Sequence, residues 1–293
     1  MSASTSLRPL LDSGELVVAP GAYDGLTARL VAQHGFRALY MTGAGTAAAA
    51  GYPDYGLLTL TEMAANAARL AEAVDLPVIA DADTGYGNEL NVARTVRAYA
   101  RAGVAALHIE DQSFPKRCGH LTGKEVVPAE EWLRKIRAAV ECRPDDELVV
   151  IARTDARAVL GFEEAVARGR AALAAGADMV FLEAPETVEE IRAVPERVGG
   201  RCLFNVVPGG RSPDVGFDQL RDWGYKLAIC PGALLGPVVA ACDRSLSDLA
   251  RRAAVASTAP GDGDGSPAGL FARVGAAEWD ALRHRFSETG AGA

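Results

Sequence analysis

Short apolar segments recur along the chain and alternate with alanine-rich stretches of helical spacing. Each apolar segment is rich in β-branched residues and apolar on both faces, which is typical of buried parallel strands. Eight strands are expected, at residues 15–19, 37–42, 77–83, 105–111, 148–156, 178–184, 202–206 and 227–232. Helices are expected between them, with clear examples over Leu60–Ala73, Val92–Ala102, Glu130–Glu141 and Phe162–Ala175.

Eight strands that alternate with helices predict an α/β fold, a (β/α)8 TIM barrel, over residues 1–256. A doubly wound sheet is the alternative, but 293 residues suit eight units, and no G-x-G-x-x-G follows the first strand. Residues 257–269 have the composition of a flexible linker. Residues 270–293 are expected to form a C-terminal helical tail, with one helix over Ala276–Ser287. This tail packs on its own barrel or is swapped onto a neighbouring subunit.

Composition and charge narrow the classes of partner. The net charge is −8, and this argues against nucleic acid, because phosphate binding needs a basic surface. The five cysteines are scattered and form no C-x-x-C pair, so we expect reduced thiols in a cytoplasmic protein. We find no signal peptide. No apolar run reaches the roughly 20 residues of a membrane span, so no membrane partner is expected.

Polar side chains interrupt the predicted strands where each strand ends, which in a barrel enzyme is the catalytic face. Charged residues are rarely buried unless they are paired or bound to metal, so several at one edge indicate a functional cleft. The polar strand-end residues are Thr42, Asp81, Asp83, His108, Glu110, Arg153, Asp155, Glu183 and Asn205.

The sequence Asp81-x-Asp83 suggests a metal site, because residues that alternate along a strand point to one face. With Asp54 and Glu110 nearby, the carboxylates form an oxygen-rich site that suits Mg²⁺, with Mn²⁺ as the other candidate. The alternative is that the two aspartates cap loops or pair with arginine.

Cys118 lies in the motif KRCGH, within a long loop that spans residues 112–128. Lys116, Arg117 and His120 surround it on a segment expected to be exposed. Adjacent positive charge lowers the pKa of a thiol, so Cys118 is a candidate acid or base. The alternative is that it is a small buried apolar side chain.

These motifs together resemble those of the isocitrate lyase and phosphoenolpyruvate mutase superfamily. The resemblance runs from Pro20 to about Cys242, and the ordered pair DADTGYGN and KRCGH is its most specific part. KRCGH is similar to the lyase branch, which includes 2-methylisocitrate lyases and 2,3-dimethylmalate lyases. The matching segments are GAYDGLTARL, YMTGAGTAAAAGYPDYG, DADTGYGN, HIEDQ, PKRCGH, IARTDA and FLEA.

The resemblance implies a role for each matching residue. Metal would be held by Asp81 and Asp83, with Asp54 and Glu110 helping through water. A substrate carboxylate would be bound by Thr42, Gly43 and Ala44. The catalytic residues would be Tyr40, His108, Cys118, Arg153 and Glu183, with Cys118 as the acid. Substrate would also be contacted by Asn205 and by Lys116, Gly119 and His120, which lie on a gate that closes over it.

The implied activity is that of a carbon–carbon lyase. It would cleave a 2-hydroxy di- or tricarboxylate to a 2-oxo acid, such as pyruvate, and a carboxylate. Methylisocitrate lyases carry Arg after KRCGH or KKCGH, whereas Leu121 stands here, which favours a smaller diacid. Pro208 and the sequence Cys230-Pro-Gly also depart from the pattern of relatives.

Several alternatives stay open. The chain also resembles carboxyvinyl-carboxyphosphonate phosphonomutase, a P–C bond enzyme, and oxaloacetate hydrolysis is a third possibility. A barrel that binds a metabolite without turnover would be expected to lack the acid or a metal carboxylate. The resemblance further implies a homo-oligomer, most simply a tetramer.

Overall fold

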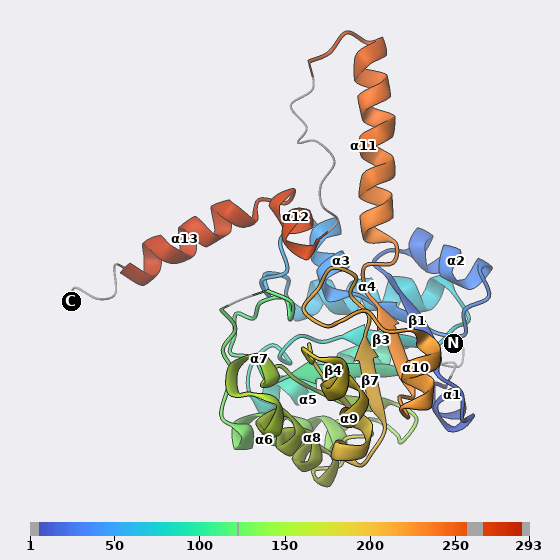
Figure 1. Cartoon of the computed structure of the whole chain (residues 1–293), viewed down its shortest axis with the longest axis vertical. Coiled ribbons are helices and arrows are strands. Elements are labelled where there is room, and N and C mark those ends of the chain that lie inside the picture. Colours follow the sequence, from blue (N-terminus) through green and yellow to red (C-terminus); the bar gives the residue numbers. More distant parts are fainter. Residues whose placement is uncertain (1–5, 122, 257–265, 289–293) are drawn as a thin grey trace.

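The structure, a computed structural model, describes residues 6–121, 123–256 and 266–288. Within these residues eight parallel strands close into a barrel in the order β1 to β8 (Figure 1). This confirms the TIM barrel and all eight predicted strands. The strands are β1 Val17–Ala22, β2 Leu39–Met41, β3 Val78–Asp81, β4 Ala106–Glu110, β5 Val149–Thr154, β6 Met179–Leu182, β7 Cys202–Asn205 and β8 Leu227–Cys230.

Helices follow the strands and surround the barrel, and α4 has the bounds predicted for it. Side chains cap the amino ends of several of them, as where Thr59 and Glu62 form a capping box at the start of α4. The barrel helices are α1 Arg8–Asp12, α2 Gly25–Gln33, α3 Gly43–Ala49, α4 Leu60–Ala73, α5 Glu89–Arg101, α6 Ala129–Cys142, α7 Arg157–Leu160, α8 Phe162–Ala174, α9 Val188–Val198 and α10 Phe217–Asp222.

Two layers of apolar side chains stabilise the barrel. Alternate residues of the strands fill its interior, among them Ile79, Ile151 and Phe181, while the others pack outward against the helices. Leu7, which precedes α1, and Leu11, near the end of α1, belong to the interior cluster. The interior is therefore a packed core and not a channel, as is usual for this fold.

Strand register brings the polar strand-end residues together. Asp81 lies opposite His108 across the β3–β4 pair, and Glu110 lies opposite Arg153 across the β4–β5 pair. Because all eight strands are parallel, their carboxyl ends meet at one end of the barrel, as the sequence predicted.

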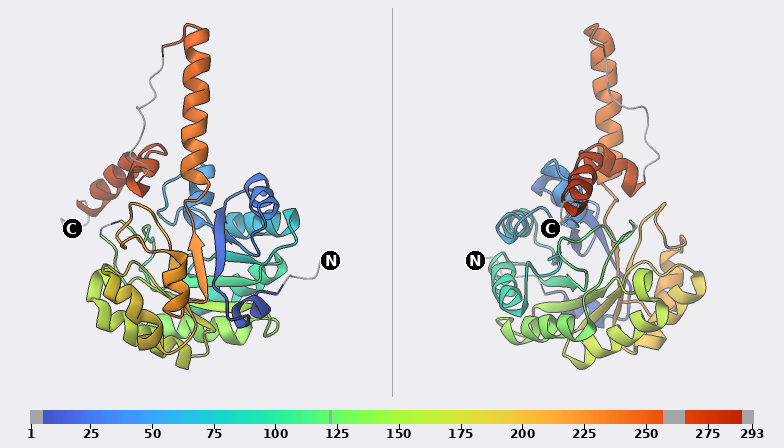
Figure 2. Two further views of the ribbon diagram at one scale, coloured as in Figure 1. Left: turned by 45° about the vertical axis from the view of Figure 1, so that its right-hand side comes forward. Right: turned by 90° about the vertical axis from the view of Figure 1, so that its left-hand side faces the viewer.

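Three C-terminal helices lie at this same end (Figures 1 and 2). Helix α11, Leu235–Arg252, projects away from the barrel, and Leu235 is its one buried residue. The tail contains α12, Pro267–Ala272, and α13, Ala276–Glu288, which confirms the predicted tail helix. Ser266 caps α12, so helical structure begins inside the segment expected to be linker. The rest of that segment, 257–265, lies outside the described residues.

Two global expectations can be compared with the structure. In the described part of the chain, no helix combines the length and apolar character that a bilayer crossing requires. The five cysteines, all of which are described, are free thiols, as the scattered spacing indicated.

Candidate active site

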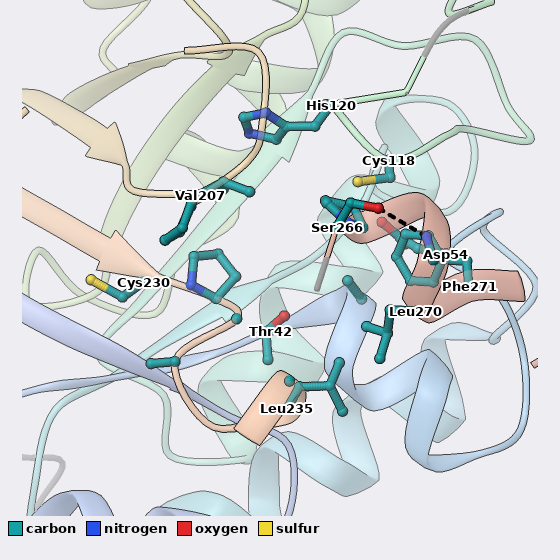
Figure 3. A pocket seen from close by; sticks show the side chains of 18 of the residues that line it. Thr42, Asp54, Cys118, His120, Val207, Cys230, Leu235, Ser266, Leu270 and Phe271 are labelled. Carbon is teal, nitrogen blue, oxygen red and sulfur yellow. Dashed lines mark hydrogen bonds between the residues drawn. The ribbon is translucent and has the colours of Figure 1, made fainter. Parts of the chain in front are cut away.

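A cavity of about 1490 Å³ opens at the carboxyl ends of the strands. Figure 3 shows Thr42, Cys118, Val207 and Leu235 arranged around it. Eleven residues predicted for the site line the cavity, namely Tyr40, Thr42, Ala44, Asp54, Asp81, Cys118, Gly119, His120, Arg153, Glu183 and Asn205. Five others are buried among or behind them, namely Gly43, Asp83, His108, Glu110 and Lys116.

Arg153, at the end of β5, joins three buried carboxylates. Its guanidinium lies 3.1 Å from Glu110 Oε2, 3.4 Å from Glu183 Oε2, and donates to Asp155 Oδ2 at 3.0 Å. Burial opposes charge on Glu183, but Arg153 and His120 outweigh it and lower the pKa of Glu183 to about 2. Burial raises the pKa of Glu110 well above its usual value despite the nearby Arg153.

Asp81 ends β3 beside an aromatic pair. The Tyr40 hydroxyl lies 2.9 Å from His108 Nε2 and donates to Asp81 Oδ2 at 3.3 Å. Burial opposes ionisation of Asp81, but His108, Lys116 and Arg153 together lower its pKa to about 2. Burial also lowers the pKa of His108 to about 4, so its imidazole is neutral at pH 7 while Asp81 is charged.

The first turn of α3 packs directly against Asp81. A Cβ at Gly43 would overlap the Asp81 carboxylate, so this position requires glycine. Thr42 caps the helix, and its hydroxyl accepts from the Gly45 N–H at 3.1 Å. Thr42 and Ala44 both line the cavity, so the amino end of α3 faces the space beside the Asp81 carboxylate.

Three of the four carboxylates expected to bind a metal are paired with basic side chains in this structure. Among the described residues, no group of three His, Cys, Asp or Glu side chains is arranged to hold a metal. Lys116 lies between two of the carboxylates instead, paired with Asp54 and 3.0 Å from Asp83 Oδ1. Asp83 also lies beyond the strand, with φ 46°, so strand alternation does not place it next to Asp81.

Asp81 and Asp83 nevertheless contact each other, because the Asp83 N–H donates to Asp81 Oδ1 at 2.9 Å. Burial raises the pKa of Asp83 to about 6. Glu110 Oε1 is buried and has no hydrogen-bond partner. The charged Asp81 is therefore the strongest candidate for direct contact with a cation.

Cys118 differs from the sequence prediction. Its side chain is partly buried in the loop and not exposed. Burial, reinforced by Asp54, raises the thiol pKa to about 12, whereas the neighbouring basic residues were expected to lower it. The reason is that burial outweighs the lowering effect of Lys116, which is paired with acidic groups, as Arg117 is with Asp280. Cys118 is therefore a protonated thiol at neutral pH.

His120 connects the loop to the ends of β6 and β7. Its Nδ1 accepts from the backbone N–H of Arg211 at 3.1 Å, so the ring proton is on Nε2, which lies 2.9 Å from Glu183 Oε1. The Asn205 side-chain amide donates to both Glu183 oxygens at 3.2 and 3.3 Å. These contacts fix His120 against the cavity wall.

Lys124 is a structural part of the site that the sequence did not assign, and its partner Asp155 was expected only as a strand-end residue. The Lys124 ammonium donates to the Gly119 carbonyl and, at 2.9 Å, to Asp155 Oδ1, so it ties the loop to β5. A Cβ at Gly119 would lie 2.6 Å from Arg153, so the loop approaches the Arg153 cluster closely. A lysine between Gly123 and Glu125 in a loop gave no signal of such burial.

The cavity has the groups to bind an anionic, oxygen-rich substrate and to protonate it. Charged Asp81 and the guanidinium of Arg153 lie in the cavity with a protonated thiol on a loop above them. The opposite wall is apolar, and it includes Val207, Cys230 and Leu235.

Known proteins of similar sequence and structure include lyases. Residues 7–250 match the family described as phosphoenolpyruvate phosphomutase. The chain is 49% identical over 234 residues to 2,3-dimethylmalate lyase of Eubacterium barkeri, covering 80% of this chain and 81% of that one. It is 46% identical over 225 residues to 2-methylisocitrate lyase of Aeropyrum pernix, covering 77% and 72%. A crystal structure of 2,3-dimethylmalate lyase matches with a TM-score of 0.82 and 45% identity, covering 97% and 95%.

Replacing Lys124 tests how far ion pairing holds the loop. We expect Lys124→Met to lower the free energy of unfolding by about 3 kcal/mol, because Asp155 loses a buried cationic partner. Lys135→Met is the matched control. Lys135 is also buried, but it donates only to the Thr84 carbonyl at 3.3 Å, so its loss should cost about 1 kcal/mol. Urea unfolding measures both, and equal losses would contradict the role given to Lys124.

Proposed function

The chain belongs to the phosphoenolpyruvate phosphomutase family and is an enzyme of the isocitrate lyase superfamily, and we propose that it cleaves a small 2-hydroxy dicarboxylate. The substrate is of the 2,3-dimethylmalate type, and the products are a 2-oxo acid such as pyruvate and a carboxylate. The observation that carries the proposal is a protonated Cys118 thiol lining the same cavity as charged Asp81 and Arg153.

The site residues fit a hard divalent cation, Mg²⁺ or Mn²⁺. Asp81 is charged, and the unpartnered Glu110 Oε1 supplies an acceptor for bound water. Mg²⁺ commonly takes one or two carboxylates and keeps water for its other positions, so Asp81 would bind it with Asp83, Asp54 and Glu110 contributing through water. When bound, the cation supplies Lewis-acid stabilisation of negative oxygen.

The amino end of α3 supports the binding of the substrate carboxylate. Thr42, Gly43 and Ala44 would offer a hydroxyl and backbone N–H groups to that carboxylate, next to Asp81. Asn205 and His120 are held by Glu183 on the opposite side and would contact the second carboxylate. Arg153 stabilises the negative charge that develops as the carbon–carbon bond breaks.

Cys118 is assigned as the acid. The 2-hydroxyl loses its proton to water, and its oxygen becomes the carbonyl of the 2-oxo acid. As the bond between carbons 2 and 3 breaks, its electron pair remains on carbon 3 as an enolate-type carbanion. The Cys118 proton moves to that carbon. A pKa near 12 keeps the thiol protonated through the physiological range, so the acid is ready in every cycle. Lys116 and Lys124 hold the loop by its ion pairs, and closure of the loop excludes water.

Leu121 limits substrate size. Its N–H donates to the Cys118 carbonyl at 3.0 Å, so it shares a turn with the acid, and an additional carboxylate bound next to it would face an apolar side chain with no charge. The apolar wall opposite, which includes Val207 and Leu235, suits methyl groups. Both features favour 2,3-dimethylmalate over the tricarboxylate 2-methylisocitrate.

Substrate choice is tested by comparing the two acids by NMR. We expect pyruvate and propionate from 2,3-dimethylmalate, and at least about tenfold lower kcat/KM for 2-methylisocitrate, because a missing charge partner costs more than about 1.4 kcal/mol. Leu121→Arg should shift the preference toward the tricarboxylate, and Leu121→Met should not. Oxaloacetate and phosphonopyruvate are included, and the best turnover on either of them would refute the proposal.

The same assay with Cys118→Ser tests whether Cys118 is the proton donor. The hydroxyl of serine is a much weaker acid than a thiol, so kcat should fall by about 100-fold or more while substrate binding by calorimetry persists. Near-normal turnover by this variant would remove Cys118 from the mechanism.

Metal dependence follows from the charged Asp81. We expect EDTA to abolish turnover and added Mg²⁺ or Mn²⁺ to restore it, because oxygen ligands bind these cations reversibly. Asp81→Asn should remain inactive at saturating metal. Asp222→Asn, which changes an exposed aspartate on α10 that pairs with Arg221, is the control and should behave as wild type. Full activity of metal-stripped enzyme would exclude the cation.

We also propose that the chain assembles as a homo-oligomer, a tetramer. Helix α11 projects from the barrel (Figure 2) and exposes Val238, Leu246 and Leu249, an apolar face that a second copy would bury. Light scattering should therefore report a multimer at micromolar concentration. The double variant Leu246→Glu and Leu249→Glu should give smaller species, whereas Leu90→Glu on α5, which is more exposed than either, should not. A wild-type monomer would contradict this assignment.

A further inference from the structure

Helix α13 contacts the catalytic loop through one acidic side chain. Asp280 accepts from the Tyr55 hydroxyl at 3.0 Å through Oδ2 and from Arg117 Nη2 at 2.6 Å through Oδ1. Arg117 immediately precedes Cys118, and Tyr55 immediately follows Asp54, the partner of Lys116. A tail residue therefore bonds the neighbours of two site residues.

Aromatic contacts reinforce the same junction. The guanidinium groups of Arg117 and Arg283 each lie over the Tyr55 ring, 5.3 and 5.4 Å from its centroid. Trp279 meets the Tyr52 ring edge-on, with centroids 6.1 Å apart. Three residues of α13 therefore contact the segment 52–55 or Arg117, and a guanidinium over an aromatic ring adds attraction at such a site.

The loop residue held by α13 is itself fixed from the barrel side. The Gln112 side chain donates to the Arg117 carbonyl at 2.8 Å and accepts the Arg117 N–H at 3.0 Å. These bonds fix the backbone of Arg117, so its side chain extends to Asp280 from a set position. A movement of the loop that carries Cys118 away from the cavity must therefore break or shift the Asp280 contacts.

The tail also closes the cavity on this side. Phe271 of α12 is buried, and Leu270 and Phe271 line the cavity across from Val207 (Figure 3). The two tail helices thus contribute different parts: α12 supplies apolar wall, and α13 supplies the polar attachment to the loop.

We propose that α13 is a clamp for the catalytic loop and that Asp280 is its positioning residue. Docking of α13 holds residues 113–121 over the cavity and keeps Cys118 partly buried and in place. The effect of the clamp on turnover rests on the proposed lyase activity. The clamp itself is tested by how exposed Cys118 is, which requires no turnover. The two ideas are therefore separable by experiment.

The test is the rate at which iodoacetamide alkylates Cys118 in the full chain without substrate, followed peptide by peptide with mass spectrometry. In Asp280→Asn we expect about fivefold to tenfold faster alkylation, the change that loss of a partly buried ion pair gives to a local opening equilibrium. Cys142 on α6 serves as an internal reference, and its rate should not change. Asp280→Glu should return the rate toward that of wild type.

Two further variants establish that the effect belongs to the Asp280–Arg117 pair. Asp218→Asn removes an exposed aspartate of α10 that pairs with Arg221, and it should leave Cys118 as slow as in wild type. Combining Asp280→Asn with Arg117→Gln should accelerate alkylation no more than the stronger single variant, since both break one contact. An unchanged rate in Asp280→Asn, or an equal increase in Asp218→Asn, would overturn the clamp.

Kinetics on 2,3-dimethylmalate add a second readout. With the clamp weakened, kcat should fall severalfold more than KM changes, because the bound substrate waits for the loop to close. Slow alkylation in wild type and fast alkylation in Asp280→Asn, together with no lyase turnover in either, would refute the proposed function and leave the clamp intact.

Discussion

The site depends on the ion pairs of Arg153. A single guanidinium at the end of β5 serves Glu110, Asp155 and Glu183, which come from three neighbouring strands. Burying these carboxylates without a cation would be strongly unfavourable, and removing the cation would leave them uncompensated. Arginine suits the position because its planar fork donates in several directions and keeps its charge when buried.

Lysines extend this arrangement from the barrel to the loop. Lys124 shares Asp155 with Arg153 and bonds the loop carbonyl at Gly119, and Lys116 pairs with Asp54 and Asp83. Charge, more than apolar contact, therefore positions the segment around Cys118. With the basic neighbours engaged, burial dominates the thiol and raises its pKa. Burial of the loop thus keeps Cys118 as a proton donor, although Lys116 acts in the opposite direction.

The cavity has a polar side and an apolar side, and each contacts a different part of a substrate. Its polar side, built from strand ends, meets the carboxylates and the developing charge of a substrate. Its apolar side, with Val207 and Leu235, accepts hydrocarbon substituents. The C-terminal helices add to this second side through Phe271 and to the loop through Asp280. The barrel supplies the chemistry, while segments after β8 contribute to its enclosure.

The sequence by itself determined the barrel and most of the site. Strand and helix periods are local properties, and parallel strands necessarily gather their carboxyl ends, so Asp81, His108, Arg153 and Glu183 could be placed together before any coordinates. The tertiary structure decided which opposite charges meet. The pairs are those of Lys116 with Asp54 and Asp83, of Lys124 with Asp155, and of Asp280 with Arg117. Their members lie between 31 and 163 positions apart in the sequence, or on loops without a repeating pattern. The direction of the Cys118 pKa shift depended on burial of the thiol, which outweighs the lowering effect of Lys116, and burial of a loop residue is decided by the tertiary structure.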